Sequence, residues 1–84
     1  MVGYPPERVR WACRRGMLEL DILLLGFFDG CYTSLPEPVQ QSFIDLLASS
    51  DQDLNQWLLS YENAPESFQL ICKRVGDYHR RLAP

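Results

Sequence analysis

Basic residues are too few in this chain of 84 residues to give it a positive charge, because eight lysines and arginines stand against eleven aspartates and glutamates. Proteins that bind DNA or RNA normally present a basic face to the phosphates, so the net charge of −3 argues against a nucleic-acid partner. The three cysteines, Cys13, Cys31 and Cys72, have no C-x-x-C spacing. This excludes a disulfide framework and a zinc site, and we expect three thiols in the core.

Long hydrophobic runs are also absent. The most apolar stretch, residues 22–28, is far shorter than the roughly 20 residues that a membrane-spanning helix needs, and the N-terminus lacks the basic-then-apolar order of a secretory signal. We therefore expect a cytoplasmic protein without direct membrane insertion. The length suits one domain, residues 1–84, with an ordered core at about residues 7–79 and mobile termini.

Signatures of catalysis are missing as well. Neither G-x-G-x-x-G nor G-x-x-x-x-G-K-[ST] occurs, and the one histidine, His79, has no group placed to orient it. Two pairs of carboxylates, Glu19 with Asp21 and Asp51 with Asp53, fall at expected helix starts, where capping and the helix dipole account for them. We expect no catalytic residue, no metal and no cofactor of the protein's own, and hence not an enzyme.

Apolar residues, which make up 46% of the chain, recur at helical rather than strand spacing. The pattern predicts an all-α fold, a single small five-helix bundle. The first helix is expected to begin near Glu7 and to break at Gly16, because glycine is about 1 kcal/mol worse than alanine inside a helix and suits a helix end. The alternative is one helix over residues 7–29, with Arg15 and Glu19 paired one turn apart.

The second helix is expected to end at residues 29–30, an Asp-Gly pair. Two serines have the spacing of a capping box, Ser34 with Glu37 before the third helix and Ser50 with Asp53 before the fourth. The residues expected to be buried by the last four helices are Leu20, Leu24, Phe27 and Cys31; Val39, Phe43, Leu46 and Leu47; Leu54, Trp57, Leu58 and Tyr61; and Phe68, Ile71, Cys72, Val75 and Tyr78.

One stretch, W-A-C-R-R-G-M-L-E-L-D at residues 11–21, sets charges and a glycine beside the most apolar segment. Capping and dipole effects explain Gly16 and Glu19. They do not explain the tryptophan, the two arginines and the methionine at the same corner, which are residue types enriched in protein interfaces. The stretch is either a partner-binding corner or a simple helix junction. The residues of the candidate corner are Trp11, Arg14, Arg15, Gly16, Met17, Glu19 and Asp21.

The string R-G-M-L-E at residues 15–19 resembles the R-G-x-x-E signature of the SdhE family of succinate dehydrogenase flavin-attachment factors. The resemblance extends to F-F-D at residues 27–29, to Tyr32 and to D-x-D-L-x-x-W-L at residues 51–58. It implies a small helical protein that binds the flavoprotein subunit of succinate dehydrogenase, and of fumarate reductase. It also implies that the factor promotes covalent attachment of FAD to that subunit by positioning rather than by supplying reacting groups. We expect a monomer.

By the same resemblance, Arg15, Gly16 and Glu19 carry the binding. Gly16 lets a backbone approach, Arg15 contacts a carboxylate or carbonyl, and Glu19 accepts from the partner or holds Arg15 in place. Arg15→Ala and Glu19→Ala are then surface changes, expected to alter stability by at most about 0.5–1 kcal/mol. Two other functions stay open: an antitoxin-type module for a small membrane toxin, and a protein that itself carries FAD, with Trp11 or Tyr32 stacked on the flavin.

Overall fold

Five α-helices and two short 3-10 helices make up residues 5–82, the part of the chain that this computed structural model describes, and no strand occurs there. The all-α, five-helix fold expected from the sequence is confirmed. In chain order the elements are α1 (Pro6–Ala12), α2 (Leu18–Cys31), η1 (Tyr32–Ser34), α3 (Glu37–Leu47), α4 (Asp51–Leu59), η2 (Tyr61–Asn63) and α5 (Glu66–Leu82).

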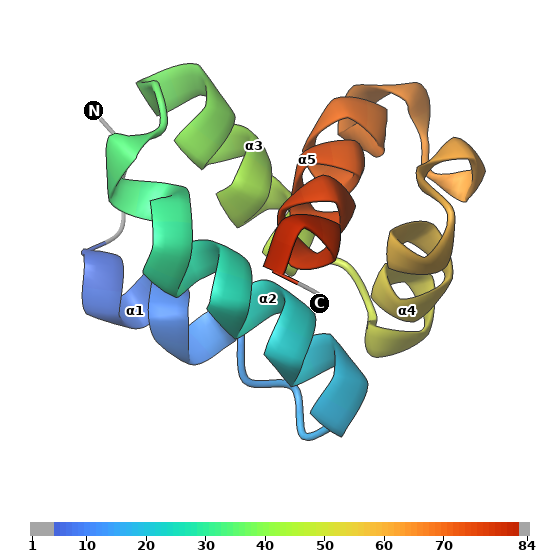
Figure 1. The fold of residues 1–84 in the computed structure, drawn as a ribbon, viewed down its shortest axis with the longest axis horizontal. Helices are drawn as coiled ribbons and strands as arrows, with labels where there is room; N and C mark the ends of the chain where they lie inside the picture. Colours follow the sequence, from blue (N-terminus) through green and yellow to red (C-terminus); the bar gives the residue numbers. More distant parts are fainter. Residues whose placement is uncertain (1–4, 83–84) are drawn as a thin grey trace.

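Helix α5 is the longest element and contacts three of the other helices. Figure 1 shows it between α3 and α4, with α2 running diagonally below it. None of the helices described is long and apolar enough to cross a membrane. One buried core takes residues from all five α-helices, from η1 and from two connecting segments. It consists of Val9, Cys13, Leu20, Leu24, Phe27, Phe28, Tyr32, Phe43, Ile44, Leu46, Leu47, Leu54, Leu58, Ala64, Ile71, Cys72 and Val75.

Aromatic rings fill the middle of this core. Phe43 is fully buried, and its ring centroid lies 5.3 Å from that of Phe27 and 5.8 Å from that of Tyr32. Tyr32 in turn stacks on Phe28 at 4.7 Å. Such ring pairs contribute to stability beyond the area they bury. The residues that were expected to be buried but lie at the edge of the core, only partly buried, are Cys31, Val39, Trp57, Tyr61, Phe68 and Tyr78.

The predicted break at Gly16 is confirmed, and the alternative of one helix over residues 7–29 is wrong. Helix α1 ends at Ala12, and residues 13–17 form a loop before α2 begins. Gly16 has a φ angle of +82°, in the left-handed region that side chains disfavour. The glycine therefore shapes the middle of the loop rather than capping α1 directly.

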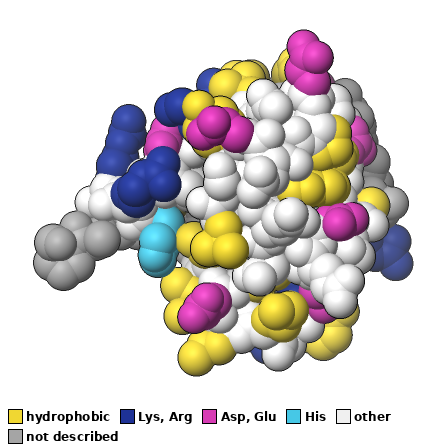
Figure 2. All heavy atoms as spheres, turned by 90° about the vertical axis from the view of Figure 1, so that its right-hand side faces the viewer, with side chains coloured by type: hydrophobic (Ala, Val, Ile, Leu, Met, Phe, Trp, Pro, Cys, Tyr) yellow, Lys and Arg dark blue, Asp and Glu magenta, His cyan; other side chains and the backbone are white. Residues whose placement is uncertain are grey.

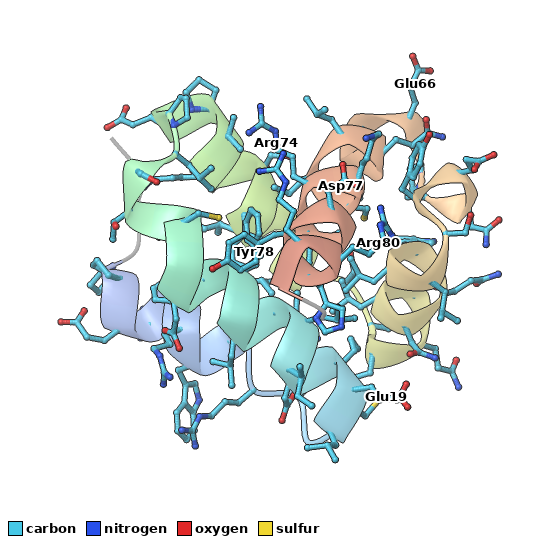
Figure 3. The ribbon with its side chains drawn as sticks, viewed as in Figure 1. Glu19, Glu66, Arg74, Asp77, Tyr78 and Arg80 are labelled. Atoms are coloured by element: carbon cyan, nitrogen blue, oxygen red, sulfur yellow. The ribbon has the colours of Figure 1, made fainter. Side chains whose placement is uncertain are left out.

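The predicted end of the second helix at residues 29–30 is wrong, because α2 continues to Cys31 and passes into η1. Gly30 allows a close helix contact instead. A Cβ atom at this position would overlap the hydroxyl end of the Tyr78 side chain. Figure 3 shows Tyr78 reaching from α5 toward α2. The glycine thus leaves room for the Tyr78 side chain where α5 packs on α2.

We expect Gly30→Ala to lower the free energy of unfolding by about 1–3 kcal/mol, because the Tyr78 ring must move away. Without that contact the change would favour the helix by up to about 1 kcal/mol. The same substitution in a Tyr78→Ala background should therefore be neutral or stabilising. Urea denaturation of the single and double variants measures the difference. An equal loss in both backgrounds would show that Tyr78 is not the obstacle.

Of the two predicted capping boxes, only the one at α4 has the hydrogen bond from the helix backbone to the serine side chain. The Ser50 side-chain oxygen accepts a hydrogen bond from the backbone N–H of Asp53 at 3.2 Å. Helix α3 begins after Pro36, without a side-chain cap. Ser34 belongs to η1, and its hydroxyl donates to the Cys31 carbonyl at 2.9 Å, closing the preceding turn. The capping box predicted for the third helix is therefore wrong.

The cysteines are free thiols. Cys13 and Cys72 are fully buried, whereas Cys31 is half-buried. Burial raises the pKa of the Cys13 thiol to about 12 and that of Cys72 to about 11, so both stay neutral at physiological pH. These two act as small apolar core residues, as expected. Within residues 5–82, no group of His, Cys, Asp and Glu side chains is arranged to hold a metal ion.

Candidate functional site

The side chain of Arg15 turns inward, toward the connection between α3 and α4. Its Nε atom donates to a carboxylate oxygen of Asp51 at 2.7 Å. Its Nη atoms donate to the carbonyls of Leu47 and Ser49, both at 2.8 Å, and of Ala12 at 3.1 Å. Only 17% of the side chain is exposed. The expectation that Arg15 is an open surface residue is therefore wrong, because tertiary contacts use most of its donors.

Asp21 also directs its carboxylate to its own chain. One oxygen accepts the backbone N–H of Arg15 at 2.7 Å. The Asp21 N–H in turn donates to the Met17 carbonyl at 2.9 Å, in the first turn of α2. The loop of residues 13–17 is thus held from two sides, by Asp21 on α2 and by the connection between α3 and α4. The left-handed conformation of Gly16 completes this fixed path.

Arg14 and Glu19 behave differently from these residues. Both are exposed, and neither side chain makes a hydrogen bond or an ion pair with the described part of the chain. Glu19 does not hold Arg15, one of the roles that the resemblance implied, since Arg15 pairs with Asp51. The charges of Arg14 and Glu19 are therefore available to a group outside this chain.

Exposed apolar side chains lie next to these two charges along the chain. Trp11, in the last turn of α1, is 73% exposed, and Met17 in the loop is 40% exposed. The first turns of α2 add Leu18 and Ile22, which are 76% and 50% exposed and were not singled out from the sequence. Leu18 and Ile22 are four residues apart, so they share one face of the helix, and neither belongs to the buried stripe of α2. This pattern in the sequence could have identified them as an exposed apolar pair. We call the corner surface the set Trp11, Arg14, Met17, Leu18, Glu19 and Ile22.

A groove of about 290 Å³ extends the corner surface toward α4 and α5. Glu19 and Ile22 line it from α2, Leu59 from α4, and His79 and Arg80 from α5. Figure 2, which views the molecule from the α4 side, shows hydrophobic side chains in separate patches and basic ones gathered beside the end of α5. The groove therefore joins apolar walls to charges of both signs.

An ion pair joins α1 to α2. Nε and Nη2 of Arg10 donate to the two carboxylate oxygens of Asp29 at 2.9 and 3.0 Å, a bidentate arrangement. The hydrogen bond from Arg10 lowers the pKa of Asp29, and the same bond raises the pKa of Arg10. Because both side chains are largely exposed, the pair contributes little to stability. The aspartate of the F-F-D string, Asp29, therefore has a structural role: it binds Arg10, the residue before Trp11.

The FAD-carrier alternative named Trp11 or Tyr32 as the residue that stacks on a flavin. Tyr32 is buried in the core and its ring already stacks on Phe28, so it cannot serve as a surface stacking platform. That part of the alternative is wrong. Trp11 remains exposed.

Residues 7–78 match the model of a family described as flavinator of succinate dehydrogenase. The chain belongs to this family. A relative from Shewanella oneidensis, named FAD assembly factor SdhE, is 48% identical over 77 residues, 92% of each chain. A second of the same name, from Photobacterium profundum, is 48% identical over 77 residues, 89% of this chain and 88% of that one. A third, from Aliivibrio fischeri, is 52% identical over 54 residues, 64% of this chain and 63% of that one.

The match to the flavinator family covers the whole corner surface and most of the groove beside it. Residues 7–78 include the whole corner surface and the pair formed by Arg15 and Asp51. The resemblance noted in the sequence at residues 15–19 is therefore confirmed at the level of the family.

Proposed function

We propose that this protein is an assembly factor that binds the flavoprotein subunit of succinate dehydrogenase, and that of fumarate reductase, and promotes covalent attachment of FAD. The observation that carries the proposal is the family match over residues 7–78, with relatives named FAD assembly factors at 48% identity over 77 residues. In this role the protein is not an enzyme, has no cofactor of its own, and acts as a monomer in the cytoplasm.

The corner surface suits binding better than chemistry. Its apolar side chains supply contact area whose removal from water favours association. Its two free charges, on Arg14 and Glu19, can form charge-assisted hydrogen bonds that orient the partner. The factor acts by favouring a conformation of the flavoprotein in which the FAD and the residue that receives it are aligned.

The residues singled out in the sequence divide into two groups in this proposal. The exposed ones contact the partner directly, and the internally bonded or backbone-determining ones shape the loop that presents them. The first group is Trp11, Arg14, Met17 and Glu19, and the second is Arg15, Gly16 and Asp21.

We expect Glu19→Ala to weaken binding to the flavoprotein subunit at least about ten-fold, a change of about 1.4 kcal/mol, because an unpaired carboxylate is lost from the corner surface. Each variant is coexpressed with a flavoprotein subunit in cells that lack the natural factor, and covalent flavin is measured by in-gel fluorescence. The affinity of the purified proteins is measured in parallel.

Glu66→Ala is the matched control for the charge, because Glu66 is also an exposed glutamate in the first turn of a helix, and Figure 3 shows it far from Glu19. For the apolar contacts, Leu18→Ala is compared with Leu70→Ala, an exposed leucine of α5. Full fluorescence with Glu19→Ala and Leu18→Ala at limiting expression would place the interface elsewhere. A wild-type protein that does not bind the flavoprotein subunit would refute the function itself.

A further inference from the structure

The start of α4 is connected to the loop of residues 13–17 by the guanidinium of Arg15. Arg15 and Asp51 are 36 positions apart in the chain, yet their side chains meet at 2.7 Å. Both are partly shielded from water, with 17% and 41% of the side chain exposed. The other donors of Arg15 reach carbonyls of Leu47 and Ser49 just before α4. The ion pair with Asp51 therefore connects the first residue of α4 to the loop that carries two residues of the corner surface, Arg14 and Met17.

We propose that Asp51 is a positioning residue for partner binding. It orients the Arg15 guanidinium, and through it the loop of residues 13–17, in the form that presents the corner surface. Neither side chain touches the partner in this account. The inference rests on the proposed function, because it assigns what shapes the surface that the flavoprotein subunit contacts.

The loop of residues 13–17 depends on hydrogen bonds for its conformation, because most of its residues are not buried in the core. Arg14, Gly16 and Met17 are exposed, so packing against the core contributes little to holding their backbone. Backbone hydrogen bonds hold the two ends of the loop. Between them, the side-chain restraints are the Asp21 carboxylate on the Arg15 N–H and the Arg15 side chain on the connection between α3 and α4. A loop that is already ordered loses less conformational entropy on binding, and therefore binds more tightly.

Asp51 is suited to this role because arginine has donors only and needs acceptors in a fixed geometry. Carbonyls accept from the Nη atoms, and the carboxylate of Asp51 is the acceptor for Nε and the counterion for the charge. Without Asp51 the guanidinium keeps its carbonyl partners but loses the contact that sets its rotation. The loop then samples several conformations, of which only some match the partner.

Asp53 provides the matched control. It lies in the same first turn of α4 and carries the same charge, so its removal has the same effect on the helix dipole. Its side chain is exposed and forms no hydrogen bond or ion pair with residues 5–82. Asp51→Asn serves as the conservative variant, since the amide oxygen can still accept from Nε of Arg15.

The experiment measures the affinity of Asp51→Ala, Asp51→Asn and Asp53→Ala for the flavoprotein subunit, at a temperature where circular dichroism shows each protein folded. Asp51→Ala should bind about ten-fold more weakly, whereas Asp53→Ala should match the wild type and Asp51→Asn should retain most of the affinity. In an Arg15→Ala background, Asp51→Ala should have no further effect on the affinity of the folded protein. Amide NMR signals of residues 14–17 in the free protein should shift or broaden with Asp51→Ala and not with Asp53→Ala.

An Asp51→Ala protein with a lower melting temperature but wild-type affinity and unchanged loop signals would overturn the inference, because the role of Asp51 would then be structural only. The proposed function would stand in that case, since the wild type and Asp51→Ala both bind. Failure of the wild type to bind the flavoprotein subunit would overturn both.

Discussion

Arg15→Ala should lower the free energy of unfolding by about 2–4 kcal/mol, since a charged donor with several acceptors is removed. The change leaves the carbonyls of Leu47 and Ser49 without their donor and Asp51 without its ion-pair partner. For an 84-residue domain, whose total stability is expected near the low end of about 5–15 kcal/mol, this is a large share. Urea denaturation of the purified variant measures it.

Arg14→Ala is the matched control, because Arg14 is the neighbouring arginine, is exposed, and its side chain makes no hydrogen bond or ion pair with the described residues. Its removal should change stability by no more than about 0.5 kcal/mol. Similar denaturation midpoints for the two variants would contradict the contacts assigned to Arg15. A large difference would also mean that lost flavin attachment in Arg15→Ala cells reflects instability, which makes Glu19→Ala the cleaner test of the interface.

Phe43→Ala should have the largest effect on stability, a loss of about 3–5 kcal/mol, because it opens a cavity in the centre of the core. Phe43 is fully buried and packs against the rings of Phe27 and Tyr32. A loss of this size can unfold much of the protein at physiological temperature. Thermal unfolding followed by circular dichroism, with urea denaturation at low temperature, measures the change.

Trp57→Ala is the comparison for this prediction. Full burial of Trp57 was expected from its spacing with Leu54 and Leu58, but its side chain is only partly buried and packs on Phe68 at 5.8 Å. The residual contact with water reduces the expected loss to about 1–3 kcal/mol. A greater loss for Trp57→Ala than for Phe43→Ala would contradict the placement of the core.

The sequence predicted those features of the fold that depend on local interactions. The helical stripes were evident because burial on one side of a helix recurs every three or four residues, and residues such as Leu24, Leu46 and Val75 lie in the core as expected. The cap at Ser50 is equally local, because its oxygen reaches only three residues along the chain. The break at Gly16 follows from the backbone freedom of glycine itself.

Features of the candidate site were predicted less well, because their residue types suit several environments. An arginine beside a glycine can contact a partner at the surface or form hydrogen bonds within its own chain. For Arg15 only the position of Asp51 decides between the two. In the same way, Leu18 and Ile22 look like core residues until the direction of α2 turns them outward. Local sequence cannot distinguish these cases, since the partner of each group lies on another element.

By itself the sequence determined the all-helical class, the positions of most core residues, the loop at Gly16 and, through its R-G-x-x-E string, the family. The tertiary structure alone decided that Arg15 braces the loop from inside while Glu19 stays free. It also decided that Gly30 serves a helix contact rather than a helix end. The physical reason is the same in each case: helix formation and capping involve residues a few positions apart, whereas these contacts join residues that meet only when the helices pack.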